Sequence, residues 1–124
     1  MQLHHVALIA SSEERADRFY HGILKLKKIK TSQLTGDLAI KIFAVDIACP
    51  FVLYGDDRIA FEIFITDQIP AVNTPLNHVC LQVDDREAFI EACRAEGAEV
   101  ILIPRGDYHL CFVKDLDGNL FEIK

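Results

Sequence analysis

The chain contains an internal repeat in which a short apolar segment is followed directly by a polar segment. The first copy joins His5–Ala10 to Ser11–Arg15, and the second joins His78–Val83 to Asp84–Glu87. Both apolar segments open with a histidine. A pattern that occurs twice in one chain indicates two copies of one supersecondary unit, so the fold should be built from two similar halves.

The polar segments predict the starts of two helices. Ser11 with Glu14, and Asp84 with Glu87, have the spacing of a capping box, in which two side chains satisfy free amides of the first turn. Each helix should run for about ten to twelve residues. A glycine stands near each expected helix end, where a left-handed residue is favoured: Gly22 and Gly97.

Short apolar runs separated by turn residues predict about three further strands in each half. In the first half they are expected at Lys27–Gln33, Leu38–Ala48, Phe51–Tyr54 and Ile59–Ile65. In the second half they are expected at Ala98–Ile103, Tyr108–Lys114 and Leu120–Lys124. The sequence therefore predicts one α+β domain of two tandem βαβββ modules, with module 1 at about residues 1–66, a proline-containing linker at about 67–75 and module 2 at about 76–124.

The composition favours a folded protein with a small-molecule partner. Hydrophobic residues make up 51% of the 124 residues, which is enough for a packed core. Acidic residues outnumber basic ones 19 to 13, and a surface of that sign repels nucleic acid. No apolar stretch is long enough to span a membrane, and no signal peptide precedes the first predicted strand. The four cysteines form no C-x-x-C pair and are expected to be reduced core residues of a cytoplasmic protein: Cys49, Cys80, Cys93 and Cys111.

Four polar residues within apolar strands recur at the same places in the two modules. His5 and His78 open the first strands, and Glu62 and Glu122 lie in the closing strands, each between a phenylalanine and an isoleucine. Because side chains alternate along a strand, each glutamate should point away from the helix-covered face on which its apolar neighbours pack. Two imidazoles and two carboxylates are therefore expected on the open face.

A divalent metal site accounts for this recurrence. A lone strand histidine is usually a surface or core residue, and a lone strand glutamate often protects a sheet edge. The same pair in both modules favours ligation, because neutral imidazole and ionised carboxylate are ligands of nickel, zinc, manganese and iron. Four protein ligands would leave positions open for a substrate, as in a catalytic site.

Four segments of the chain resemble the vicinal oxygen chelate superfamily, also called glyoxalase/bleomycin resistance/dioxygenase proteins. They are His5–Leu8, Phe61–Ile63, Asn77–Leu81 and Asp115–Ile123, the last with an Asp-Gly-Asn turn before its apolar strand. The resemblance covers essentially the whole chain. It implies a half-open barrel around one divalent metal that the substrate chelates through two neighbouring oxygens, and it implies a homodimer.

The set His5, Glu62, His78 and Glu122 is similar to the metal ligands of nickel-dependent glyoxalase I, a lactoylglutathione lyase. This similarity implies a lyase or isomerase that moves a proton through a metal-bound enediolate. It makes Glu122 the general base and Glu62 the second carboxylate. The sequence leaves open whether the four ligands meet within one chain or across two subunits.

Two features depart from glyoxalase I and put glutathione in doubt as a substrate. An arginine is expected on or just after the first strand to hold glutathione, and Ala7–Ser12 contains none; Leu38–Tyr54 is also unusually apolar. The alternatives are a metal-dependent epimerase, an extradiol dioxygenase, a fosfomycin-resistance transferase, and a metal-free ligand-binding protein of the bleomycin-resistance kind. The four candidate ligands and the absence of tryptophan favour an enzyme over the last of these.

Three further residues are candidates for substrate contact. Gln82 follows His78 by four positions and should share its face. Arg105 lies in a predicted turn, where it can meet an anionic substrate or remain solvated. Counting residues along the predicted hairpin places the Cys111 side chain toward the cavity, unless the strand register shifts by one residue. Of the remaining histidines, His4 and His21 are expected at the surface, and His109 is expected to be partly exposed, with a place in the pocket as the alternative.

Overall fold

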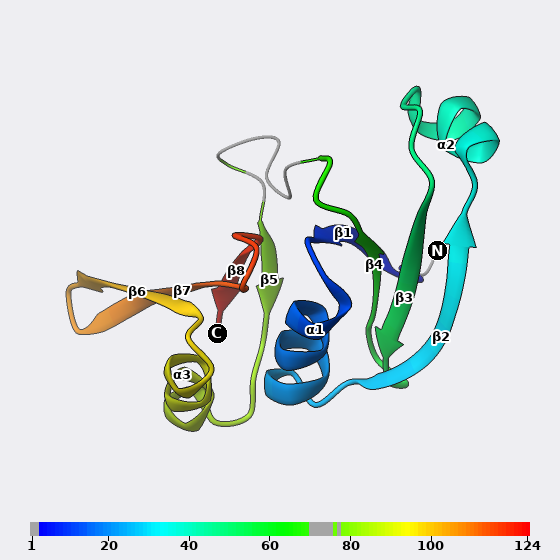
Figure 1. Ribbon diagram of the computed structural model, residues 1–124. Helices are drawn as coiled ribbons and strands as arrows, with labels where there is room; N and C mark the ends of the chain where they lie inside the picture. The colour runs from blue at the N-terminus through cyan, green and yellow to red at the C-terminus, as the bar shows by residue number, and fades with distance from the viewer. Residues whose placement is uncertain (1–2, 70–75, 77) are drawn as a thin grey trace.

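The computed structural model describes residues 3–69, 76 and 78–124 (Figure 1). Its first module contains β1 (Val6–Ala10), α1 (Glu13–Ala16), the π-helical η1 (Asp17–Ile23), β2 (Lys27–Leu34), α2 (Gly36–Phe43), β3 (Cys49–Gly55) and β4 (Ala60–Ile65). Its second module contains β5 (Val79–Leu81), α3 (Arg86–Ala95), β6 (Glu99–Arg105), β7 (Tyr108–Lys114) and β8 (Leu120–Ile123). Of the predicted linker, residues 70–75 lie outside the described part of the chain.

The two modules share one sheet topology. The strand orders are β1-β4-β3-β2 and β5-β8-β7-β6. In each sheet the first strand pairs in parallel with the last, and the last pairs antiparallel with the strand before it. The predicted α+β fold of two βαβββ modules is confirmed. No helix in the described ranges has both the length and the apolar character needed to cross a membrane.

The first helix of each module begins one residue later than the capping-box pattern predicts. Ser12 Oγ accepts a hydrogen bond from the amide of Arg15 at 3.3 Å, and Asp85 Oδ1 accepts one from the amide of Ala88 at 2.9 Å. Both cap residues have extended backbone, which lets the side chain reach the N3 amide. The Ser11 hydroxyl is used elsewhere, since it donates to the turn before β8.

The prediction of a strand over Leu38–Ala48 is wrong, because α2 forms over its first half and the rest of the segment is irregular up to the start of β3 at Cys49. Alternation of leucine and isoleucine from Leu38 to Ile42 imitates a strand pattern, although those side chains are exposed. The helix instead buries Ala39 against a small apolar cluster that includes Leu34 and Cys49. Tertiary packing therefore overrides the local pattern here.

One face of the first sheet packs against α1 and η1, one face of the second packs against α3, and these faces form the core. The buried residues on these faces alternate along the closing strands, as predicted: Phe61, Ile63, Phe121 and Ile123. The rings of Phe61 and Phe121 have centroids 6.0 Å apart, and Tyr20 of η1 contacts both. Because a glutamate follows the phenylalanine in each strand, this packing fixes both glutamates on the opposite face.

Hydrogen bonds join the two modules at the turn that leads into β8. Tyr20 Oη donates to Asp115 Oδ2 at 3.0 Å, inside the core. Asn119 Nδ2 donates to the carbonyl oxygen of Ile9 at 2.8 Å. Asp115 and Asn119 are both buried, so these bonds replace contacts that water would otherwise make. The turn is thereby anchored to β1 and to η1.

Gly97 follows α3 with φ +81°, as its predicted helix-ending role requires. A Cβ at this position would meet nothing within 4 Å, so the cost of a side chain comes from the backbone alone. We expect Gly97→Ala to lower the free energy of unfolding by about 1 kcal/mol in urea denaturation. Gly22→Ala is the control, because Gly22 has helical backbone and ordinary space around it. Its stability should stay level or rise.

Candidate functional site

The first module places one histidine and one glutamate together on the open face of its sheet. His5 lies directly before β1, and Glu62 lies within β4. β1 and β4 pair in parallel with Ala7 opposite Glu62, which brings the start of β1 beside this carboxylate. His5 Nε2 and Glu62 Oε1 are 3.9 Å apart, and both side chains remain partly accessible to solvent.

The second module repeats this arrangement. His78 lies directly before β5, and Glu122 lies within β8, the parallel partner of β5. His78 Nε2 and Glu122 Oε2 are 3.7 Å apart. The other ring nitrogen of His78, Nδ1, is 3.0 Å from the carbonyl oxygen of Leu76. A proton on Nδ1 would be donated to that carbonyl and would leave the Nε2 lone pair free for a ligand bond.

Each pair has the donor chemistry of half a metal site. A neutral imidazole nitrogen and a carboxylate oxygen are ligands that divalent first-row metals accept. In the ranges that the structure describes, however, no three His, Cys, Asp or Glu side chains lie close enough together to hold a metal ion. The four residues are therefore of the types that bind a divalent metal. Within one chain, however, they form two separate histidine–glutamate pairs and not one group of four.

Cys80 lies on this face and was missed by the sequence interpretation. It is exposed while the other three cysteines are buried, so the expectation of a core residue is wrong for Cys80. In the register of β5 and β8 it lies opposite Glu122. Desolvation and the neighbouring Glu122 carboxylate raise the pKa of its thiol. The sequence did indicate this placement, because Cys80 follows His78 by two positions and alternate residues of a strand share a face.

The predicted substrate contacts do not gather at one place. Gln82 is exposed just after β5. Arg105 is exposed at the end of β6, in the hairpin that projects away from β8 (Figure 1). The prediction that Cys111 faces the cavity is wrong, because Cys111 is 1% exposed within the core. Phe112 lies opposite Glu122, so the adjacent Cys111 points to the other face. Three histidines are exposed, as predicted: His4, His21 and His109.

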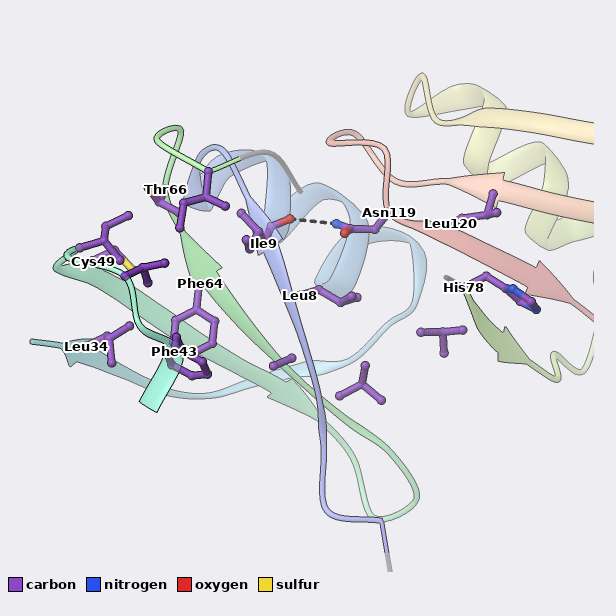
Figure 2. Close-up of a pocket in the computed structure, with 16 residues that line it drawn as sticks. Leu8, Ile9, Leu34, Phe43, Cys49, Phe64, Thr66, His78, Asn119 and Leu120 are labelled. Carbon is purple, nitrogen blue, oxygen red and sulfur yellow. Dashed lines mark hydrogen bonds between the residues drawn. The ribbon is translucent and has the colours of Figure 1, made fainter. Parts of the chain in front are cut away.

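A mainly apolar groove of about 610 Å³ lies beside these pairs. Its walls come from β1, β4, α2 and the segment after α2, and from residues of β5 and β8 across β1. Figure 2 shows Phe43 and Phe64 on one side of β1 and His78 on the other. The ring centroids of Phe43 and Phe64 are 5.8 Å apart. The groove therefore extends from one candidate ligand to the apolar surface beside α2.

Residues 2–123 match the family model described as the Glyoxalase/Bleomycin resistance protein/Dioxygenase superfamily. The chain belongs to this superfamily. Among curated members, the "Probable lactoylglutathione lyase" of Vibrio parahaemolyticus is 26% identical over 127 residues, covering 96% of this chain and 86% of the relative. The "Lactoylglutathione lyase" of Haemophilus influenzae is 28% identical over 131 residues, covering 98% and 90%.

Solved structures of the glyoxalase superfamily share the fold. The glyoxalase family protein from Enterococcus faecalis has a TM-score of 0.73 at 24% identity and covers 98% of this chain and 95% of that one. The fosfomycin resistance protein FosX from Listeria monocytogenes, complexed with Mn(II) and sulfate, has a TM-score of 0.71 at 20% identity, with coverage of 98% and 87%. The superfamily and its two-module fold, both expected from the sequence, are confirmed.

Proposed function

We propose that this glyoxalase-superfamily protein is a divalent-metal-dependent lyase or isomerase of the glyoxalase I type. It would move a proton between neighbouring carbons of a small substrate that carries two adjacent oxygens. The observation that carries the proposal is the twin pairing of His5 with Glu62 and of His78 with Glu122, at 3.9 and 3.7 Å. The two lactoylglutathione lyases among its relatives support the same reaction class.

The metal would be held by His5, Glu62, His78 and Glu122. Their nitrogen and oxygen donors suit nickel, zinc, manganese or iron. When bound, such an ion supplies a Lewis acid that polarises substrate oxygens and stabilises the negative charge that develops on them. The Mn(II) complex of the FosX neighbour supports a metal of this kind.

A homodimer would complete each site. Every chain offers two half-sites, and a twofold dimer that sets module 1 of one copy against module 2 of the other would create two four-ligand sites. The hairpin of β6 and β7 carries exposed apolar side chains that a second copy would cover: Leu102, Ile103 and Tyr108.

Glu122 is the general base in this proposal. Its carboxylate would take the proton from one substrate carbon and return it to the next, which requires a partly accessible group close to the substrate. Glu122 meets this condition, because it is partly accessible on the open face and lies between His78 and Lys124, whose Nζ is 3.5 Å from Glu122 Oε1. Glu62 would be the second carboxylate, at the equivalent place in module 1.

Metal content tests the proposal directly. Wild-type protein should carry or take up close to one metal ion per chain, and His78→Ala should lose most of it because a ligand nitrogen is removed. Elemental mass spectrometry measures both. His109→Ala is the control, since His109 is exposed on β7 and belongs to neither pair. If wild-type protein neither binds nickel, zinc, manganese or iron nor is stabilised by any of them, the proposal is wrong. A metal-free ligand-binding protein is then the better interpretation.

Co-expression of two variants tests the shared site. A chain with His5→Ala loses one half-site and a chain with His78→Ala loses the other. In a mixed dimer with shared sites, one site carries both substitutions and the other carries neither, so metal binding should return. If each site lay within one chain, no mixed dimer would hold an intact site and metal binding would stay lost.

A further inference from the structure

The open face of the first sheet changes from charged to apolar along its strands. Cross-strand partners on one face form rows across the sheet. One row contains Ala7, Glu62, Leu53 and Lys30. The next row contains Ile9, Phe64, Phe51 and Ser32. Beyond it α2 closes the face, where Phe43 packs edge-on against Phe64.

Within the described chain, no charged side chain lines the groove at this apolar end. Its lining there includes no lysine, arginine, aspartate or glutamate. Two of its polar residues already have partners: Asn119 Nδ2 donates to the carbonyl of Ile9, and Thr66 Oγ1 accepts from the amide of Gln68. His78 is the polar residue that remains for a ligand, at one end of the groove.

We propose that this groove binds an uncharged apolar substituent of the substrate, an alkyl chain or an aromatic ring. The proposal rests on the proposed function, because the metal ligand His78 fixes where the oxygen-bearing end of the substrate would lie. The groove volume falls within the range of about 300–1,000 Å³ that is usual for small-molecule sites. Most of its lining side chains are buried or half-buried, which suits a small molecule better than a protein surface.

The chemistry of the groove disfavours glutathione as part of the substrate. Glutathione carries two carboxylates and an ammonium group, and burying such charges without partners is costly. Ala7 and Ile9 line the groove on β1, where a glutathione-binding arginine was expected from the sequence resemblance. The apolar segment after β2, which departs from glyoxalase I in sequence, supplies Phe43 and Val45 to the same wall. Both differences from glyoxalase I therefore lie in the lining of the same apolar groove.

Alkyl hydroxamates test this proposal, because they join two adjacent oxygens to a chain of chosen length. On protein loaded with zinc, hexanohydroxamate should bind about 80-fold more tightly than acetohydroxamate, from about threefold for each of the four added methylenes. Phe43→Glu should remove this gain, since it places a charge in the groove wall. Ile42→Glu is the matched control: Ile42 is 62% exposed on the same helix and does not line the groove. Calorimetry measures the affinities, and circular dichroism checks both folds.

The outcomes separate this inference from the proposed function. A chain-length gain that Phe43→Glu abolishes and Ile42→Glu keeps would support the groove assignment. Equal binding of the two hydroxamates to the zinc-loaded protein would overturn it while leaving the metal site standing. A chain-length gain with affinities for both hydroxamates that are unchanged by zinc would support the groove and overturn the metal-dependent function.

Discussion

Replacement of Glu122 by glutamine is expected to lower turnover about 10²- to 10⁴-fold with the fold unchanged. Glutamine has nearly the same shape but cannot accept a proton at neutral pH. The isosteric change should be tolerated because Glu122 is partly accessible and its ion contacts are His78 and Lys124. Turnover can be followed with hemithioacetals formed from a 2-oxo aldehyde and an apolar thiol.

Two further measurements make the Glu122→Gln result specific. Glu99→Gln is the control, because Glu99 is exposed and pairs with Lys114 at 3.0 Å, outside both half-sites. Its turnover should match wild type. Metal content of Glu122→Gln should be measured alongside, since Glu122 is also a proposed ligand. A variant that retains both metal and full turnover would exclude Glu122 as the base.

Asp115→Ala is expected to lower the free energy of unfolding by about 3 kcal/mol or more, because it leaves buried donors without an acceptor. The Asp115 carboxylate accepts hydrogen bonds from the Tyr20 hydroxyl at 3.0 Å and from Asn119 Nδ2 at 2.7 Å. It also accepts from the backbone amides of Asp117 and Asn119, both at 2.9 Å. Chemical denaturation of the purified variant measures the loss.

The pH dependence of this loss has a defined sign. Burial raises the pKa of Asp115 above its ordinary value, although its hydrogen bonds oppose the shift. The contribution of Asp115 to stability is then largest below the unfolded-state pKa and declines as pH rises through the folded-state pKa. The penalty of Asp115→Ala should therefore be larger near pH 4 than at pH 7. Asp107→Ala, at an exposed turn, should change stability little at either pH; an equal loss in both variants would contradict the assignment.

The half-sites could be predicted because they depend on local rules. Alternation along β4 and β8 separates Glu62 from Phe61 and Glu122 from Phe121, and the repeat aligns the two modules. The parallel pairing of first and last strands then brings each histidine beside its glutamate. That pairing follows from the module topology, which the sequence order of strands and helix already indicates.

Other features depend on packing that one sequence does not specify. Cys111 points into the core because β7 pairs with β8 in the register that sets Phe112 opposite Glu122, and a shift of one residue would reverse its direction. The helix α2 forms because burying Ala39 outweighs the local strand pattern. The separation of the two pairs depends on how the modules sit together, which hydrogen bonds such as that from Asn119 to Ile9 help to fix.

The parallel pairing of β1 with β4 also sets the order in which the first module should fold. β3 pairs antiparallel with both β2 and β4, which are its neighbours in the sequence, so these pairings close short loops. β1 must instead close a loop that spans almost the whole module, since Val6 pairs with Phe61. Closing such a loop costs more chain entropy, and contacts of this range form late. His5 therefore should meet Glu62 only when β1 docks, which makes metal-binding competence one of the last properties that the folding chain acquires.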